Sequence, residues 1–485
     1  MKHVNKKIVC FVFILIISIF VCACDVTNDP SDESTAEGGG TVTEAKTNEE
    51  TDDKTVETDS FVASESSESA ETEQTESEDL TVETDETNCS DTEDSSETET
   101  ETETETETET ETETETETTD VFSLVDFVVS VPADREPVIL QLTDTQIIDS
   151  SQQRRPDRLG SVASSLWGPG NKIKNCYDYL EEIINAVKPD LILLTGDLVY
   201  GEFDDNGSNW LEFVYYMDSY GVPWAPIIGN HEAESEMGID WQCAQLEGAE
   251  HCLFLQRTLT GNGNYTVGIE QGGKLTRVFF MLDSNGSGTA SEKSLENGHT
   301  QKTAGFAYDQ RRWYMQLASN ITEISPQTKF SFACHIPPAI FRYAAEEKYG
   351  TDGTTPLFID MHESKEEGDF GYWGSAIGSA WDGNRSTWKA IKALGVDSIF
   401  VGHQHLNSAS IMYDGVRFQF GMKSSTYDQI NYIDSDGNIT GSYGSAKTPW
   451  VGGSYFKLAP DGSIKDADIY YCENAGGNID WDSFE

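Results

Sequence analysis

Five separate segments of the chain carry residues of the types that can bind metal ions. Each segment follows a short apolar run, and each offers carboxylate, amide or imidazole groups. Together these groups suit transition metals such as Fe, Mn or Zn. One such segment alone means little, because Gly-Asp pairs are common and a single histidine is most often a core residue. Their ordered recurrence favours one shared site, built from Asp144-Thr-Gln146, Gly196-Asp-Leu-Val-Tyr200, Gly229-Asn-His-Glu232, His335 and Gly402-His-Gln-His405.

The apolar runs before these segments predict β-strands, and helices are expected between them. The strands are expected over residues 138–143, 191–194, 223–228, 278–282, 330–334 and 398–401. The helices are expected over residues 172–187, 210–220, 310–318 and 386–394. Strands that alternate with helices predict an α/β fold, and such sheets place ligands just beyond strand ends.

The order of the motifs resembles the calcineurin-like metallophosphoesterase family, whose pattern runs D-x-H, GD, GNH-D/E, H and GH-x-H. The resemblance extends from Val138 to Asn407. The Gly229-Asn-His-Glu232 and Gly402-His-Gln-His405 segments look like those of the purple-acid-phosphatase-related subgroup. This resemblance implies an α/β fold in the form of a two-sheet sandwich flanked by helices, with two metal ions at the sheet edge.

The resemblance also implies a role for each candidate residue. His231 would face the substrate without binding a metal, and its neighbour Glu232 would orient it. The implied metal ligands are Asp197 as the bridge between both ions, Asp144 and His405 at the first ion, and Asn230, His335 and His403 at the second.

One position departs from the family pattern. Gln146 stands where the D-x-H motif has its histidine. In purple acid phosphatases that histidine is also missing, and a tyrosine in GD-x-x-Y binds the metal instead; Tyr200 has that position here. The alternative is that the amide oxygen of Gln146 binds the first ion. Both residues therefore remain candidate ligands.

The net charge of −55 is distributed unevenly along the 485 residues. Residues 25–120 consist mainly of Thr, Ser, Glu and Asp, and end in a Glu-Thr repeat. This segment has too few apolar groups to offset the entropy of ordering, so it predicts a disordered acidic stalk. Residues 121–485 predict one folded domain that is also acidic. The absence of a basic stripe argues against a nucleic-acid partner.

Residues 1–24 predict an export signal. Three lysines precede an apolar run from Ile8 to Ala23, which is too short for a confident membrane span. The run ends in Val21-Cys22-Ala23-Cys24, which resembles a bacterial lipoprotein signal. Lipidation of Cys24 would attach the protein to the outer face of a bacterial cell membrane. The alternative is an ordinary cleaved signal peptide.

These features together predict an extracellular, metal-dependent hydrolase of small phosphate esters. Two metal ions that share a carboxylate would lower the pKa of a bound water and stabilise the transferring phosphoryl group. A nucleotide or phospholipid phosphodiesterase is an alternative, since related folds serve several substrates. A surface binding module without turnover is another.

Overall fold

The structure is a computed structural model, and all the residues that it describes fall within one compact unit, Glu109–Glu485. The predicted leader, residues 1–24, and residues 25–119 of the predicted stalk lie outside the described residues. The described residues are 120–285, 305–350, 359–361, 368–374, 386–426, 430–443 and 451–472.

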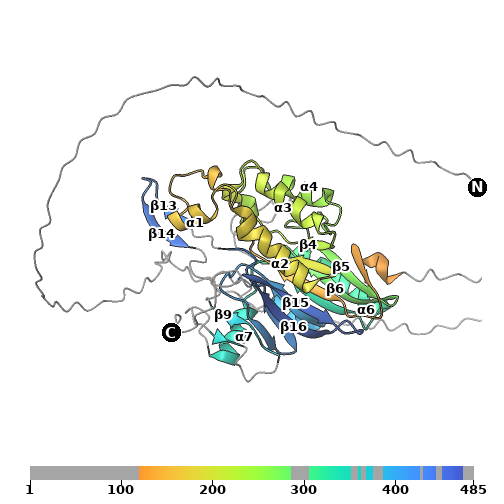
Figure 1. Cartoon of the computed structure of the whole chain (residues 1–485). Helices are drawn as coiled ribbons and strands as arrows, with labels where there is room; N and C mark the ends of the chain where they lie inside the picture. Colours follow the sequence, from red (N-terminus) through yellow and green to blue (C-terminus); the bar gives the residue numbers. More distant parts are fainter. Residues whose placement is uncertain are drawn as a thin grey trace, which may run out of the picture. The chain divides into compact units, whose positions relative to one another are not determined.

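Two β-sheets form the framework of this unit (Figure 1). The smaller sheet has the strand order β16-β15-β2-β3-β4, and its strands β2, β3 and β4 are parallel. Its bounds are β2 (Val138–Leu142), β3 (Leu191–Leu194), β4 (Trp224–Pro226), β15 (Gly452–Leu458) and β16 (Ile464–Tyr471). The larger sheet has the order β1-β5-β6-β7-β10-β12-β11, and β6, β7, β10 and β12 run parallel. Its bounds are β1 (Phe127–Val131), β5 (Tyr265–Gln271), β6 (Lys274–Met281), β7 (Lys329–Ala333), β10 (Val396–Val401), β11 (Ser410–Tyr413) and β12 (Val416–Phe420).

The two sheets pack face to face and enclose part of the core. Phe400 of β10 and Phe456 of β15 meet edge-on, with ring centroids 4.9 Å apart. Gln141 of β2 donates from Nε2 to the backbone oxygen of Val401 in β10, at 3.0 Å. A buried polar group needs such a partner, because an unpaired one would lose its water without compensation. These contacts hold the facing surfaces of the two sheets against each other.

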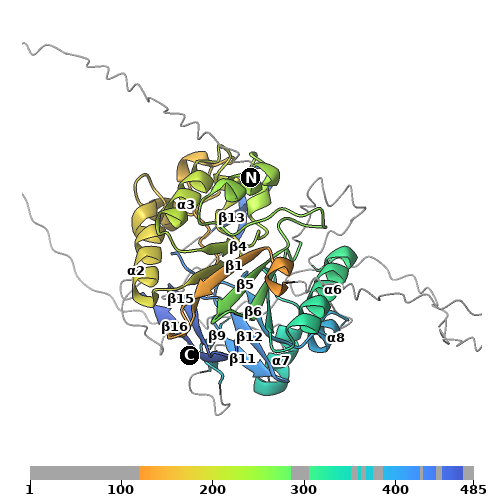
Figure 2. The same ribbon diagram turned by 90° about the vertical axis from the view of Figure 1, so that its right-hand side faces the viewer.

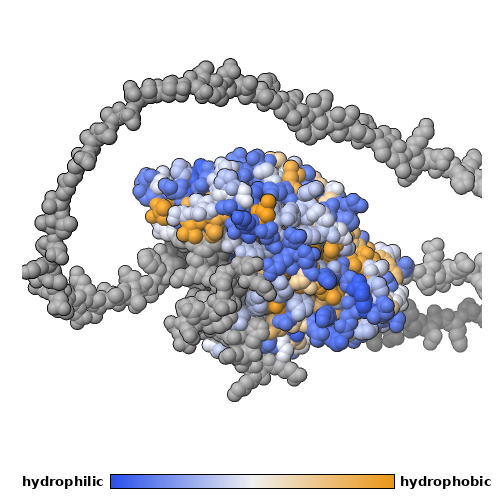
Figure 3. Space-filling model, viewed as in Figure 1, coloured by the Kyte–Doolittle hydropathy of each residue, from blue (hydrophilic) through white to orange (hydrophobic). Residues whose placement is uncertain are grey.

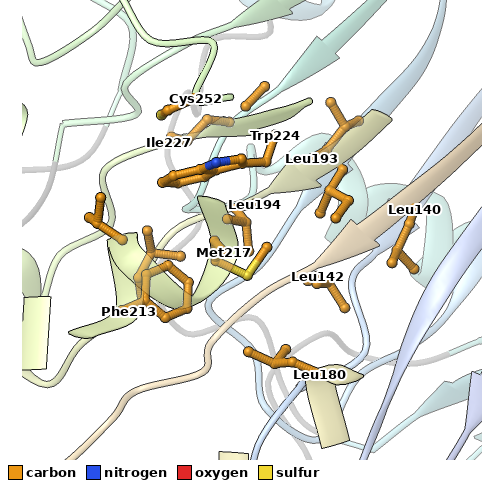
Figure 4. Packing of buried hydrophobic residues seen from close by; sticks show 14 of the residues in the cluster. Leu140, Leu142, Leu180, Leu193, Leu194, Phe213, Met217, Trp224, Ile227 and Cys252 are labelled. Carbon is orange, nitrogen blue, oxygen red and sulfur yellow. The ribbon is translucent and has the colours of Figure 1, made fainter. Parts of the chain in front are cut away.

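Helices α2 (Asp178–Val187) and α3 (Ser208–Ser219) lie outside the smaller sheet. Leu140 and Leu142 of β2 alternate with Gln141, so they face away from the larger sheet and toward α2. Figure 4 shows Leu142 with Leu180 of α2, and Trp224 of β4 with Phe213 and Met217 of α3. All of these side chains are buried. Burying an apolar side chain of this size contributes about 1.5–3 kcal/mol, so this layer stabilises the sheet strongly.

Helices α6 (Tyr308–Ile324), α7 (Ile340–Tyr349) and α8 (Ser386–Ala393) cover the outer face of the larger sheet (Figure 2). The alternation along β6 explains why both faces of this sheet are apolar. Phe279 and Met281 belong to the core between the sheets, whereas Val278 and Phe280 belong to the core under α6. A strand buried on both faces is typical of α/β layering.

The remaining elements lie around this framework: α1 (Ser161–Leu166), α4 (Ile239–Gly248), the hairpin of β13 (Ile430–Ile433) and β14 (Ile439–Tyr443), and the short pair of β8 (Ile359–Asp360) and β9 (Tyr372–Trp373). A π-helix, Ile173–Tyr177, leads into α2. The face in Figure 3 is mainly hydrophilic with scattered apolar groups. Among the described residues, no helix combines the length and apolar character needed to cross a membrane.

The α/β sandwich flanked by helices that the sequence predicts is confirmed. Each strand and helix expected from the sequence is present, with shifted ends. The helix expected over residues 310–318, for example, extends over Tyr308–Ile324. The five described cysteines are free and buried. They are Cys176, Cys243, Cys252, Cys334 and Cys472.

Candidate metal centre

The candidate ligands all lie just beyond the carboxyl ends of parallel strands. Asp144, Asp197 and Asn230 follow β2, β3 and β4 of the smaller sheet, which are neighbours. His335 follows β7 of the larger sheet, and His403 follows the adjacent strand β10. Because the sheets face each other, five strand ends meet at one edge of the sandwich. Candidate ligands that are far apart in the sequence are thereby brought together.

The backbone at several of these residues is strained. Asp144, Gln146, Asp197 and His403 all have a positive φ, between 41° and 71°. Residues other than glycine rarely adopt this region, because Cβ crowds the backbone there. Such strain persists only where the surrounding contacts enforce it, and it is typical of functional sites.

Asp197 is the centre of one group of candidate ligands. Its Oδ2 lies 3.1 Å from Nε2 of His335, and its side chain is 1% exposed. His335 Nε2 is also 3.1 Å from Oδ1 of Asn230. The ring of His403 meets that of His335 edge-on, with centroids 5.1 Å apart. One ligand atom each from Asp197, His335 and His403 lie within 4.8 Å of one another, so one ion could contact all three.

A second ligand group uses the same aspartate. Ligand atoms of Asp144, Asp197 and His405 also lie within 4.8 Å of one another. Nε2 of His405 is 3.3 Å from Oδ1 of Asp144, and the Asp144 side chain is 1% exposed. A buried carboxylate needs a positively charged partner, and a metal ion could supply that charge. Since Asp197 belongs to both groups, the residues fit two neighbouring metal ions that share one carboxylate.

Three glycines let the ligand loops approach one another. A Cβ at Gly229 would overlap the Asp197 carboxylate, and one at Gly402 would overlap Thr143 and the Asp144 carboxylate. Gly196 has φ +93°, and a Cβ there would overlap the ring of His335. These glycines are therefore required by close packing against ligand side chains.

His335 is oriented for metal binding by its other ring nitrogen. Its Nδ1 lies 2.8 Å from the backbone oxygen of Thr195, so Nδ1 carries the proton and donates it. Nε2 then faces Asp197 and Asn230. Metal-binding histidines are generally held this way, with the second nitrogen donating to an oxygen. Burial opposes protonation of His335, but Asp197 outweighs it and raises the pKa to about 10. Binding a cation at Nε2 would therefore release a proton.

Asp197 and His403 have pKa values that favour their ligand forms. Burial opposes ionisation of Asp197, but His335 and His231 outweigh it and hold the carboxyl pKa well below its ordinary value. Burial, together with the nearby His335, lowers the pKa of His403 to about 3. An ionised carboxylate and a neutral imidazole are the forms that bind metals.

His231 lies at the rim of this centre. Its Nε2 is 3.9 Å from Asp197 Oδ2, its backbone N–H donates to Asp197 Oδ1 at 3.0 Å, and its side chain is 11% exposed. Nδ1 of His231 lies 2.9 Å from Oε2 of Glu234. Burial alone would lower the pKa of His231, but Asp197 and Glu234 raise it to about 9.

Glu232 has a different position from the one expected. It accepts from the backbone N–H of Leu198, and from that of Gly229 at 2.7 Å. Both of its oxygens are thus used to hold the loops after β3 and β4 together. The residue that contacts the His231 ring is Glu234, three positions further along, so the expectation that Glu232 orients His231 is corrected.

Tyr200 is buried against His231. The two rings lie with centroids 4.1 Å apart and an interplanar angle of 36°, and Phe203 packs on the other ring edge. Tyr200 thus lies beside the candidate centre and supports the face of His231.

Gln146 is buried between two charged groups. Its Nε2 donates to Asp197 Oδ2 at 3.3 Å, and its Oε1 accepts from Nζ of Lys423 at 3.1 Å. Lys423 was not among the residues singled out from the sequence. It follows β12, the neighbour of β10, and so obeys the same strand-end rule as the ligands. That rule, applied to every parallel strand, would have found it.

Fold and site together define a protein with paired metal-ligand groups at the edge of a two-sheet α/β sandwich. A family model for calcineurin-like phosphoesterases matches residues 137–407. The match covers more than half of the chain, and the chain belongs to this family.

Curated relatives agree with this assignment. An Arabidopsis thaliana protein named "Probable inactive purple acid phosphatase 28" is 26% identical over 305 residues, which are 57% of this chain and 69% of the relative. The Saccharomyces cerevisiae protein "Phosphatase DCR2" is 20% identical over 238 residues, which are 49% of this chain and 39% of that protein. The resemblance to purple-acid-phosphatase-related proteins is thereby confirmed.

Solved structures that are similar include a dimetal phosphatase from Danio rerio. It is 11% identical, with a TM-score of 0.35, and the alignment covers 69% of this chain and 98% of that chain. The purple acid phosphatase PPD1 from yellow lupin is 10% identical, with a TM-score of 0.32, over 69% of this chain and 53% of that chain.

Proposed function

We propose that the folded domain hydrolyses small phosphate esters with two metal ions that share Asp197. The observation that supports this most directly is that Asp197 belongs to two ligand groups at once. The family and the choice of carboxylate, amide and imidazole groups support Fe, Mn or Zn as the metals. The acidic composition of the sequence and its lack of a basic stripe favour a small ester over a nucleic acid.

The metal ions would supply a water of lowered pKa and positive charge against the phosphoryl oxygens. The residues of the chain have three tasks around them. Asp144, Asp197, Asn230, His335, His403 and His405 would hold the ions. The Glu232 carboxylate, which accepts hydrogen bonds from the backbone N–H groups of Leu198 and Gly229, would keep two ligand loops in register. His231 would protonate the leaving group or stabilise charge on the phosphoryl oxygens.

The decisive experiment compares Asp197→Ala with His231→Ala. Asp197→Ala should lose both ions and lower turnover by several orders of magnitude. His231→Ala should keep both ions and lower turnover by about 10²–10⁴-fold, the usual contribution of a positioned acid or base. Elemental analysis and turnover of aryl phosphate mono- and diesters would measure both effects. A fully active Asp197→Ala protein would refute the proposal.

The same assay separates this function from its alternatives. Preference for diesters would favour a nucleotide or phospholipid phosphodiesterase. A wild-type protein that holds two ions but turns over neither ester class would favour a binding module without turnover.

We also propose that the domain works outside the cell, attached to the outer face of the membrane through lipid on Cys24. The basic start, the apolar run and the small residue before Cys24 support this. The acidic segment 25–120 would then act as a stalk. Cys24→Ser should abolish lipid labelling and move the protein from the membrane fraction to the medium. Unchanged membrane attachment of that variant would contradict the anchor.

A further inference from the structure

A buried lysine lies beside the ligand group of Asp144, Asp197 and His405. The Lys423 side chain is enclosed, and the whole residue is 1% exposed. Its Nζ donates to the backbone oxygen of Asp144 at 2.8 Å and to Oε1 of Gln146 at 3.1 Å. Its backbone is fixed as well, because Gly452 donates to its carbonyl oxygen at 3.1 Å. The ammonium group is therefore held close to a predicted metal position.

Lys423 determines which way the Gln146 amide faces. An ammonium group has only donors, so the amide atom next to it must be the oxygen. The NH₂ end then faces Asp197, 3.3 Å from Oδ2. Reversing the amide would set NH₂ against the ammonium group, and would leave the Gln146 oxygen opposite the oxygen of Asp197. Both contacts would be repulsive.

This orientation removes a ligand from the first metal position. A metal ion binds an amide through its oxygen, and the oxygen of Gln146 is already turned toward Lys423. The positive charge of Lys423 also repels a cation nearby. Asp144, Asp197 and the neighbouring His405 still offer a place for an ion. The first position is thus retained, but the residues grouped there are three, against Asp197, Asn230, His335 and His403 at the second.

We propose that Lys423 holds Gln146 out of the coordination sphere, so that the first position binds its ion more weakly than the second and exchanges it. The inference rests on the dinuclear site proposed above. Lys423 is a positioning residue in this account, because it acts through the Gln146 amide. The tight ion is the one at Asp197, Asn230, His335 and His403.

Zinc titration of the metal-stripped chain tests the inference. Calorimetry should show two binding events whose dissociation constants differ by at least about tenfold. Changes in the groups that hold metal ligands typically alter metal affinity by this much. About one zinc per chain should survive gel filtration, by elemental analysis. His405→Ala should remove only the weaker event, and Asn230→Ala should weaken the tighter one.

Two substitutions should strengthen the weaker event. Gln146→His supplies an imidazole ligand and leaves Lys423 in place, and Lys423→Met frees the amide to turn its oxygen inward. Each should tighten the weaker event by about tenfold and bring retention to two zinc ions. Lys423→Arg keeps a charged donor and should bind zinc as the wild type does. Lys465→Met should do so too, because the ammonium group of Lys465 pairs with Glu136 on the surface. Thermal unfolding without metal would identify a variant that fails to fold.

Two binding events of equal affinity in the wild type would overturn this inference and leave the dinuclear function intact. The inference would also be overturned if Gln146→His folds and the weaker event is unchanged. If the metal-stripped chain binds none of zinc, manganese and iron, the proposed function is overturned, and this inference with it.

Discussion

At the scale of single residues, His231 lies at the rim of the candidate metal centre. Its ring is held from three sides: Asp197 faces Nε2, Glu234 binds Nδ1, and Tyr200 packs against its plane. A carboxylate at Nδ1 fixes the tautomer and the orientation of the ring. His231 can therefore present Nε2 toward a substrate without binding a metal itself.

Glu234→Gln tests this arrangement. The substitution keeps the size of the side chain but removes its charge, so the His231 ring loses its fixed orientation and part of its positive charge. Turnover should fall by about 10–100-fold while metal content stays at the wild-type level. Glu236→Gln, two residues further on, is the matched control and should change neither quantity. Loss of metal from Glu234→Gln would contradict the assignment.

The sequence predicts which residues are candidate metal ligands, but it does not predict which side chains contact the residues of the site. Asp144, Asp197 and His335 are recognisable because each ends an apolar run. The partner of His231 is not, since Glu232 and Glu234 are both near and only the turn Glu232–Glu234 decides which one faces the ring. Lys423 has the strand-end position as its signal, but its role cannot be predicted from that position, because the role depends on a side chain 277 positions away in the sequence.

At the scale of the elements, the loops after the strands can approach one another only because glycines leave room for the ligand side chains. Gly229 lies in ordinary backbone conformation, so its requirement is purely steric. Gly229→Ala should force the β4 loop away from Asp197. We expect loss of bound metal and a lower melting temperature, with a destabilisation of about 1–3 kcal/mol, as for other overpacked sites.

Gly248→Ala provides the control for that experiment. Gly248 ends α4, and a Cβ there would meet no atom within 4 Å. This substitution should leave metal content unchanged and stability equal or slightly higher, since alanine is less flexible when unfolded. Equal behaviour of the two variants, by elemental analysis and thermal unfolding, would show that the Gly229 contact is unimportant.

The sequence predicts the strands that lead into the candidate metal ligands. It predicts the strands that only complete the sheets less well. β3 is a continuous apolar run, Leu191–Leu194, because both of its faces are buried. β16, Ile464–Tyr471, includes Asp466 and Asp468 and has largely exposed or half-buried positions. Its conformation comes from pairing with β15, which is a tertiary contact.

At the scale of the whole folded unit, Arg277 joins the two sheets. The residue is fully buried in β6, and both of its terminal nitrogens bind Asp397 of the larger sheet at 2.7 Å. Its Nε donates to the backbone oxygen of Gly462, in the turn between β15 and β16 of the smaller sheet, at 2.7 Å. One guanidinium group thus connects both layers of the sandwich.

Arg277→Met should therefore destabilise the fold. It leaves the Asp397 carboxylate and the Gly462 oxygen without their partner, and we expect a loss of about 3 kcal/mol in the free energy of unfolding. Arg135→Met is the comparison: this arginine also pairs with an aspartate, Asp190, but its side chain is 47% exposed. Its loss should be below about 1 kcal/mol. Denaturant unfolding would measure both, and equal losses would rule out a special role for Arg277.

The pairing of β15 with β2 sets a limit on when the centre can form. Residues 138–141, which lead into Asp144, pair with residues 454–457 near the far end of the folded unit. A ribosome or a translocation pore releases the chain in order, so every candidate ligand emerges before β15, the strand that pairs with β2. Newly made protein should therefore acquire its ions only after nearly all of the chain is free. With export and hydrolysis as we propose them, the enzyme would in this way stay inert until it has crossed the membrane.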